Sequence, residues 1–250
     1  MARPTRSVSA IVIGQTDYGE ADRIVKLLTP DSGRISVMAR GARRSKKRFG
    51  GTLDLGNRVE MQLVAGRGRL SVLSECTLLR GHAHVRNDLG CLALLNYACE
   101  WVGALAREEH AEPKLFGLLE VALAVLDASV RMPSATFRWG LEAKALTFAG
   151  LTPALEGCTA CARELEDEAC YSAQAGGLLH PECGTGRTVS RTWWEQVERA
   201  RRTPLAELVD QPVADRVGLW VLHDHLEWHL GRGLRSRSML AQLEGDGLGN

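Results

Sequence analysis

The sequence contains no hydrophobic run close to the roughly 20 apolar residues that a bilayer-crossing helix needs. Its N-terminal apolar run is short and is broken by Gln15 and Asp17, which argues against a secretory signal. We therefore expect a cytoplasmic protein, and in that reducing compartment its seven cysteines predict metal ligands or buried thiols rather than disulfides. A G-x-x-x-x-G-K-[ST] motif is also missing, which argues against an ATP-driven motor.

The formal net charge of the whole chain is also small, at only +1. This total conceals a division along the chain. Residues 1–80 carry 15 Lys and Arg against seven Asp and Glu, a net of +8, whereas residues 81–250 carry 16 against 23, a net of −7. Such an asymmetry predicts an anion-binding module that is attached to a body with a different role.

Residues 1–80 contain five short runs rich in Val, Ile and Leu, which are separated by turn signals such as "TPDSG" and "GRG". Five strands in so short a segment predict a small β-barrel. The OB-fold is the common five-stranded barrel and is our prediction, with an SH3-like barrel as the alternative, because strand count alone does not separate the two.

From about residue 88 the pattern changes to Leu- and Ala-rich runs that are too long for strands and predict buried helices. The predicted fold class is a multidomain α+β protein, in which a five-stranded OB-fold barrel precedes an all-helical domain that carries a small zinc-binding module. The predicted domains are 1–80 for the DNA-binding OB-fold, 81–155 for a helical domain, 156–187 for the zinc-binding module and 188–245 for helices that pack with 81–155.

A cysteine-rich segment interrupts the predicted helices. Cys158 and Cys161 form a C-x-x-C pair, and His180 and Cys183 form an H-x-x-C pair that begins nineteen residues later. Two such pairs are typical of a structural zinc ribbon, and a loop this poor in large apolar residues needs a metal to order it. We expect one structural Zn²⁺ held by Cys158, Cys161, Cys183 and a fourth ligand. Cys170, which offers a softer thiolate, is slightly preferred to His180, which has the more regular spacing.

Two alternatives stay open for this segment. Ordinary thiols without a metal are the first. The second is a catalytic zinc, in a metalloenzyme that acts on nucleic acid, which would need three protein ligands, an open position and a nearby base. Glu182 raises this possibility, but the order of the motifs does not match that of zinc deaminases. The number of protein ligands separates the roles, since four close the site and three leave it open.

Six of the nine residues from Arg40 to Arg48 are basic and none is acidic. Because this run lies in the positively charged module, and because OB-folds commonly bind oligonucleotides, we predict a loop that neutralises phosphates without reading sequence. A solvated charge run is the alternative. Aromatic residues are sparse here, with only Tyr18 and Phe49 nearby, so phosphate contact should dominate over base stacking. The predicted DNA-binding residues are Arg34, Arg40, Arg43, Arg44, Lys46, Lys47, Arg48, Arg67 and Arg69.

An ordered set of segments resembles the RecO family of bacterial recombination mediators. Residues 18–25 fit a Y-x-E-x-D-x-I-V phrase, residues 29–34 fit T-x-x-x-G-R, and residues 41–44 read G-A-R-R. The segments "GLTPALEGCTAC" and "AGGLLHPEC" resemble the zinc module of that family, with His180 where a third cysteine is expected. The resemblance spans about residues 8–190.

The resemblance implies an N-terminal OB-fold, an all-helical body, a zinc module and a role without catalytic turnover. RecO-like proteins bind single- and double-stranded DNA and anneal complementary strands. They act with RecR to replace single-strand binding protein by RecA on gapped DNA. The implied partners are therefore DNA, RecR, single-strand binding protein and the RecA pathway, at a cytoplasmic, nucleoid-associated location, and the chain is not expected to be an enzyme.

Overall fold

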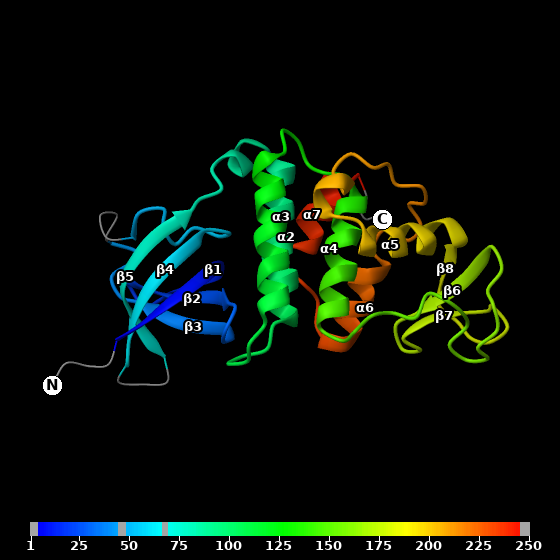
Figure 1. Cartoon of the computed structure of the whole chain (residues 1–250), viewed down its shortest axis with the longest axis horizontal. Helices are drawn as coiled ribbons and strands as arrows, with labels where there is room; N and C mark the ends of the chain where they lie inside the picture. Colours follow the sequence, from blue (N-terminus) through cyan, green and yellow to red (C-terminus); the bar gives the residue numbers. More distant parts are fainter. Residues whose placement is uncertain (1–4, 45–48, 67–69, 246–250) are drawn as a thin grey trace. The chain divides into compact units, whose positions relative to one another are not determined.

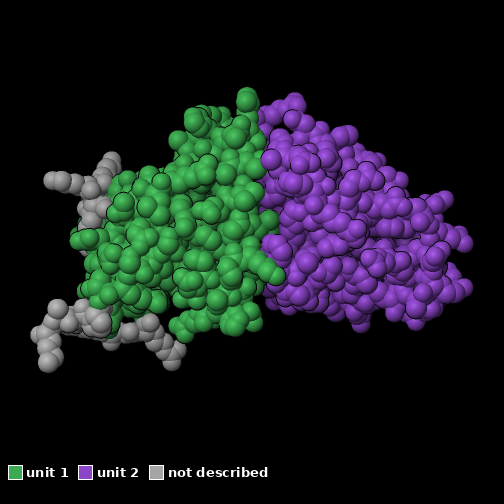
Figure 2. Space-filling view, in the orientation of Figure 1, with its two compact units in different colours: residues 1–130 green, residues 131–250 purple. Residues whose placement is uncertain are grey.

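A computed structural model of the chain describes residues 5–44, 49–66 and 70–245. The chain divides into two compact units, Met1–Val130 and Arg131–Asn250, which Figure 2 colours separately. Within the described ranges, no helix has the length and apolar character that a bilayer crossing requires.

The N-terminal strands close into a barrel in the order β1-β2-β3-β5-β4, with β1 pairing to both β2 and β4 (Figure 1). Neighbouring strands are antiparallel except β3 and β5, which pair in parallel where Val37 meets Ser71. This closed five-stranded ring confirms the predicted OB-like barrel. The strands are β1 (Thr5–Tyr18), β2 (Asp22–Thr29), β3 (Gly33–Ala39), β4 (Arg58–Val64) and β5 (Ser71–Arg80).

The barrel interior is filled by alternate residues of its strands. In β4, Val59, Met61 and Leu63 are buried while their neighbours are only half-buried, because successive side chains of a strand point to opposite faces. Phe49 and Leu53, from the connection between β3 and β4, pack against the same core. Phe49 is one of the two aromatic residues near the basic run. It is only 4% exposed, so its ring cannot stack on a nucleic-acid base.

The helical elements that follow the barrel in the first unit are η1 (His84–Asn87), α2 (Leu89–Leu105) and α3 (Pro113–Ala128). The carboxylate of Asp88 accepts a hydrogen bond from the Cys91 amide at 2.7 Å and caps the start of α2. The carboxylate of Asp127, near the end of α3, accepts bonds from the first two amides of η1. The connection that leaves the barrel is therefore tied to the helices that follow it.

The compact unit that contains the barrel extends to Val130, beyond the predicted boundary at residue 80. Helix α2 packs closely on β1: a Cβ atom at Gly103 would lie 2.9 Å from Cδ1 of Ile13, so the helix backbone comes directly against that side chain. Helices α2 and α3 lie in the compact unit of the barrel, and α4 lies in the second unit.

The second unit consists of helices and a three-stranded antiparallel sheet in the order β7-β6-β8, with the cysteine-rich segment beside that sheet. Figure 1 shows the sheet at the end of the unit that α5 approaches. Its elements are α4 (Ala135–Phe148), β6 (Glu168–Ser172), β7 (Gly177–Leu179), β8 (Arg187–Ser190), α5 (Arg191–Arg202), η2 (Leu205–Leu208), α6 (Val221–Leu230) and α7 (Arg237–Leu243).

Helix α4 carries a fully buried arginine, Arg138. The guanidinium of Arg138 donates two hydrogen bonds of 2.9 Å to the carboxylate of Glu244, and it contacts Glu142 at 2.9 Å and the carbonyl oxygen of Leu219 at 3.0 Å. It also lies 4.0 Å from the ring centre of Trp220. Because a buried charge is costly without such partners, this network ties Glu244, the residue after α7, to the first turn of α4.

Candidate zinc centre and nucleic-acid surface

Four potential metal ligands gather beside the small sheet. The ligand atoms of Cys158, Cys161, His180 and Cys183 all lie within 4.8 Å of one another. Nδ1 of His180 is 3.4 Å from Sγ of Cys161 and 3.9 Å from Sγ of Cys183. In a tetrahedral zinc site, bonds of about 2.3 Å to sulfur and about 2.0–2.1 Å to nitrogen place these atoms about 3.5 Å apart. The cluster therefore fits a zinc ion.

Backbone hydrogen bonds shape the two turns that present these ligands. In the first turn, the amide of Cys158 donates to the carbonyl of Arg163 at 3.0 Å, and the amide of Ala162 donates to the carbonyl of Cys158 at 2.8 Å. In the second, the amide of Cys183 donates to the carbonyl of His180 at 2.9 Å. His180 directly follows β7, so the sheet fixes the position of the second turn relative to the first.

The imidazole of His180 is oriented for metal binding. Its Nε2 donates to the carbonyl oxygen of Glu164 at 2.8 Å, which leaves Nδ1 as the lone-pair nitrogen facing the thiols. Burial raises the pKa of the Cys158 thiol, but hydrogen bonds from the backbone amides of His180, Cys161 and Ala160 outweigh burial and lower that pKa to about 6. Thiolate is the form of cysteine that binds zinc. His180, through its Nδ1 lone pair, and Cys158, through its lowered pKa, are therefore both in the form that a zinc ion requires.

Arg163 supplies positive charge beside the cluster. Its backbone amide and then its guanidinium lower the pKa of Cys161, and its Nε lies 3.4 Å from that sulfur. Burial, followed by the neighbouring Cys161 and Cys158 groups, raises the pKa of Cys183 to about 11, but a bound Zn²⁺ deprotonates a coordinating thiol outright. Three thiolates around Zn²⁺ leave one excess negative charge, which Arg163 is placed to offset.

Cys170, the slightly preferred fourth ligand, is not part of this group. It lies in β6, where it pairs with Leu179 and Thr188, and its half-buried side chain alternates with the buried side chains of Ala169 and Tyr171. The strand pairing holds Cys170 within the sheet, whereas the chain turns towards the cluster only at the residue after Leu179. The preference is therefore corrected in favour of His180.

The number of protein ligands bears on what the metal can do. A tetrahedral zinc with three cysteines and one histidine has no open position for water or substrate, so this donor set favours a structural ion over a catalytic one. The other three cysteines behave as small apolar residues. Burial raises the pKa of Cys76 to about 11 and those of Cys91 and Cys99 to about 12, and no second cluster of metal ligands occurs among the described residues.

Ala162, just after the C-x-x-C pair, has a φ of +58°, a left-handed conformation that disfavours any residue with a Cβ atom. Replacing Ala162 by glycine should relieve this strain and stabilise the turn by about 0.5–1 kcal/mol, which tightens zinc binding about two- to fivefold. Competition with a chromophoric chelator would measure the change. The control is Ala160→Gly, at a position without positive φ, which should weaken binding instead; equal effects of both variants would contradict the role of strain.

The zinc module is joined to the helices of its unit through a buried histidine. Nε2 of His225, in α6, donates to the carbonyl oxygen of Leu151 at 2.9 Å, and its Nδ1 therefore accepts the 2.7 Å hydrogen bond from the hydroxyl of Tyr171 in β6. Burial is the main cause that lowers the pKa of His225 to about 4. This histidine is therefore neutral and has a structural role. The polar sequence around it, "HDHLEWH", suggests an exposed helix face and does not reveal this role.

The start of the basic run is anchored on the turn between β1 and β2. The Asp22 carboxylate accepts a hydrogen bond from the amide of Gly41 at 2.8 Å. Arg43 contacts Asp17 at 3.3 Å and donates to the carbonyl of Gly19 at 2.8 Å. Arg44 contacts Glu20 at 3.0 Å in the same way. The carboxylates of the "DYGEAD" stretch thus hold the "GARR" stretch, a relation that sequence reasoning missed although both motifs were visible.

The remaining predicted DNA-binding residues divide into three groups. Arg40 is exposed directly after β3, beside the anchored stretch. Arg34 contacts other residues of its own unit, as described in the next paragraph. The others, Lys46, Lys47, Arg48, Arg67 and Arg69, lie outside the described residues.

Arg34 connects β3 to the segment between α2 and α3. Its guanidinium donates to the carbonyl oxygen of Gly103 at 3.0 Å and pairs with Glu108 at 3.1 Å. The preceding Gly33 has a φ of +55°, and a Cβ atom there would lie 2.4 Å from the carbonyl oxygen of Arg107, so the contact requires glycine. Arg34 therefore contributes to packing, since its guanidinium already has partners within its own unit.

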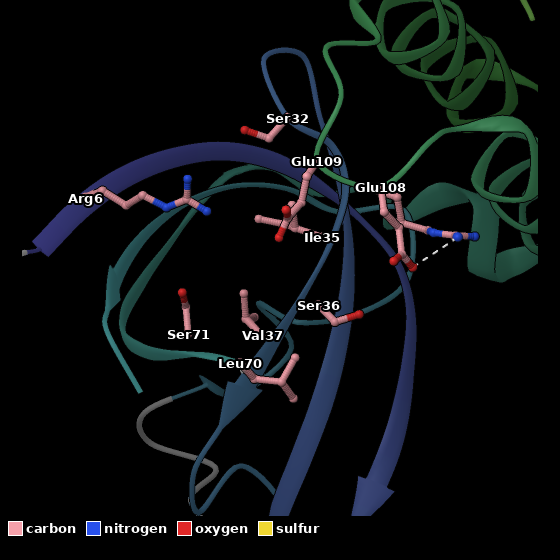
Figure 3. Close-up of a pocket in the computed structure, with 10 residues that line it drawn as sticks. Arg6, Ser32, Ile35, Ser36, Val37, Leu70, Ser71, Glu108 and Glu109 are labelled. Atoms are coloured by element: carbon pink, nitrogen blue, oxygen red, sulfur yellow. Dashed lines mark hydrogen bonds and ion pairs between the residues drawn. The ribbon is translucent and has the colours of Figure 1, made fainter. Parts of the chain in front are cut away.

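A pocket of about 600 Å³ lies on the barrel beside this contact, and Figure 3 shows Arg6 directed into it from β1. The charges of its lining oppose one another, since Arg6 and Arg34 face Glu108 and Glu109. Such a balance favours neither a phosphate nor a metal cation. The pocket therefore does not add to the candidate nucleic-acid surface.

Comparison with known proteins places both parts of the chain in one family. Residues 1–82 match the family described as "Recombination protein O N terminal", and residues 86–238 match "Recombination protein O C terminal". The junction between the two matches lies near the boundary predicted at residue 80, although α2 and α3 pack in the same compact unit as the barrel.

Similar proteins cover nearly the whole chain. "DNA repair protein RecO" of Myxococcus xanthus is 32% identical over 241 residues, covering 94% of this chain and 96% of that protein. Proteins of the same name from Anaeromyxobacter dehalogenans and Pelobacter propionicus are 34% and 32% identical over 247 and 241 residues, with 94% and 96% of this chain covered. The chain therefore belongs to the RecO family of DNA repair and recombination proteins.

Proposed function

We propose that this chain is a recombination mediator without catalytic activity. It binds single- and double-stranded DNA without strong sequence preference and anneals complementary strands. With RecR, it helps to load RecA onto DNA that is covered by single-strand binding protein, in the cytoplasm where the chromosome lies. The observation that carries this proposal is the basic run that begins at Arg40, anchored on the barrel of a RecO-family chain.

Electrostatics support DNA binding by the barrel. Residues 1–80 carry the net charge of +8, whereas the net −7 of residues 81–250 opposes contact with phosphates. The ion pairs of Arg43 and Arg44 are at least partly exposed, and exposed pairs contribute only about 0–1 kcal/mol. Phosphate can therefore replace Asp17 and Glu20 at little cost, while the carboxylates keep the arginines in position beforehand.

Annealing follows from the same charges. Two complementary strands repel each other through their phosphates, and a cationic loop that neutralises some of those phosphates lowers this repulsion. Backbone contact without base readout leaves the base edges accessible for pairing. The acidic body is then available for protein partners, for which RecR and single-strand binding protein are proposed from the family.

The zinc centre supports a role without turnover. With Cys158, Cys161, His180 and Cys183 as ligands, zinc would hold the module in its folded form and offer no site for a substrate. No observation favours the metalloenzyme alternative over this one.

A direct test combines binding, annealing and product analysis. The full-length protein is titrated into labelled single-stranded and duplex DNA of several sequences, and the DNA is then recovered and examined for chemical change. We expect similar affinities for different sequences, accelerated annealing of complementary strands, and unchanged DNA. Cleaved or modified DNA would contradict the absence of catalysis, and DNA covered by single-strand binding protein that gains no RecA in the presence of RecR would contradict the mediator role.

A further inference from the structure

Tyr18 is the aromatic side chain of the described barrel that remains accessible beside the basic run. It is 56% exposed, whereas Phe49 is buried in the core. The last four residues of β1 are all exposed, so the hairpin of β1 and β2 extends beyond the packed part of the barrel, with Tyr18 at its end. More than half of the surface of Tyr18 is therefore open to solvent at the end of the hairpin.

The register of the hairpin places this ring close to the basic run. Tyr18 pairs with Asp22 across the two strands, so both side chains lie on one face, with Cβ atoms about 5 Å apart. The Asp22 carboxylate in turn binds the amide of Gly41 at 2.8 Å, and Gly41 directly follows the exposed Arg40. Nucleotides in a stacked strand rise about 3.4 Å each, so one short stretch of DNA can reach both the ring and the basic side chains.

We infer that Tyr18 stacks on a base of single-stranded DNA while Arg40, Arg43 and Arg44 contact its phosphates. An exposed aromatic ring beside a cationic track is the combination by which proteins bind single strands without sequence preference, because every base has a stacking face. In a duplex those faces are covered by neighbouring bases. Tyr18 therefore gives the surface a preference for single strands that phosphate contacts alone cannot give.

This inference rests on the proposed function and has a test of its own. Tyr18→Ala should weaken binding to a single-stranded oligonucleotide about tenfold, equivalent to about 1.4 kcal/mol and within the range of one base–aromatic stack. Affinity for duplex DNA should change less than about twofold. The salt dependence should stay as in the wild type, because no phosphate contact is removed.

Two control variants isolate the ring. Tyr18→Phe keeps the stacking face and should bind like the wild type. Trp228→Ala removes an aromatic ring that is equally exposed, at 56%, in the other unit, and should change neither affinity. A thermal melt of each variant checks that the protein remains folded.

An abasic oligonucleotide gives an independent readout. The wild type should bind it more weakly than the normal strand, whereas Tyr18→Ala should bind both strands equally, because the stack is already lost. The inference is overturned if Tyr18→Ala keeps wild-type affinity for single strands, or if Tyr18→Phe loses as much as Tyr18→Ala. A wild-type protein that binds neither single strands nor duplex would instead overturn the proposed function and this inference with it.

Discussion

Replacing Cys158 and Cys161 by serine is expected to release the zinc ion and unfold the module around it. These thiols supply half of the four clustered ligands, and Cys158 is only 2% exposed. Apparent binding free energies of structural zinc are about 10–16 kcal/mol, so loss of the ion removes a large part of the free energy that keeps the module folded. Metal analysis of the purified protein should find about one zinc per chain in the wild type and essentially none in the double variant, with faster proteolysis between β6 and β8.

Cys170→Ser is the matched control, because Cys170 belongs to the same module but lies outside the cluster. It should keep stoichiometric zinc, whereas His180→Ala should lose it. His180→Cys should restore binding, since thiolate is a good zinc ligand. Stoichiometric zinc in the Cys158 and Cys161 double variant would contradict the assignment, and zinc loss in Cys170→Ser would reinstate Cys170 as a ligand.

Changing Arg43, Arg44, Lys46 and Lys47 together to alanine should remove most of the salt-dependent affinity for DNA. If about five of the six basic groups meet phosphates of a single strand, log affinity falls with log salt at a slope near −3.5, from about −0.7 per contact. Between roughly 50 and 200 mM salt the wild type then loses about 130-fold in affinity, and a variant with one contact left loses about threefold. Fluorescence anisotropy over this salt range measures both slopes.

The variant should stay folded, since the ion pairs of Arg43 and Arg44 are at least partly exposed and contribute little to stability. Annealing should decline together with affinity. The matched control removes the same charge from exposed arginines of the second unit, Arg131, Arg202, Arg232 and Arg235. An unchanged slope in the basic-run variant would contradict the role of this loop. An equal loss in the control would show that net charge rather than this loop governs DNA binding.

The barrel could be predicted because its physical signals are local. Each strand carries alternating or continuous apolar residues between glycine- and proline-containing turns, and β4 shows the resulting alternation of buried and half-buried side chains. The zinc turns were equally visible, because the C-x-x-C and H-x-x-C spacings are themselves the geometry of two tight turns.

Other features depend on residues that are far apart in the chain. Arg34 looked like part of a basic surface, but it pairs with a loop more than 70 positions away. Arg138 gives no sign in the sequence of its buried contacts with Glu142 and Glu244. The partners of a charged side chain are set by packing, which a local pattern does not contain.

By itself the sequence determined the five-stranded barrel, the helical character of the rest and three of the four residues in the candidate metal cluster, because propensity, periodicity and spacing act over a few residues. Only the tertiary structure decided between Cys170 and His180, between Tyr18 and Phe49 as an accessible ring, and where the compact units divide. Each of these choices depends on which face of an element packs against a distant one, and the fold must form before that face is defined.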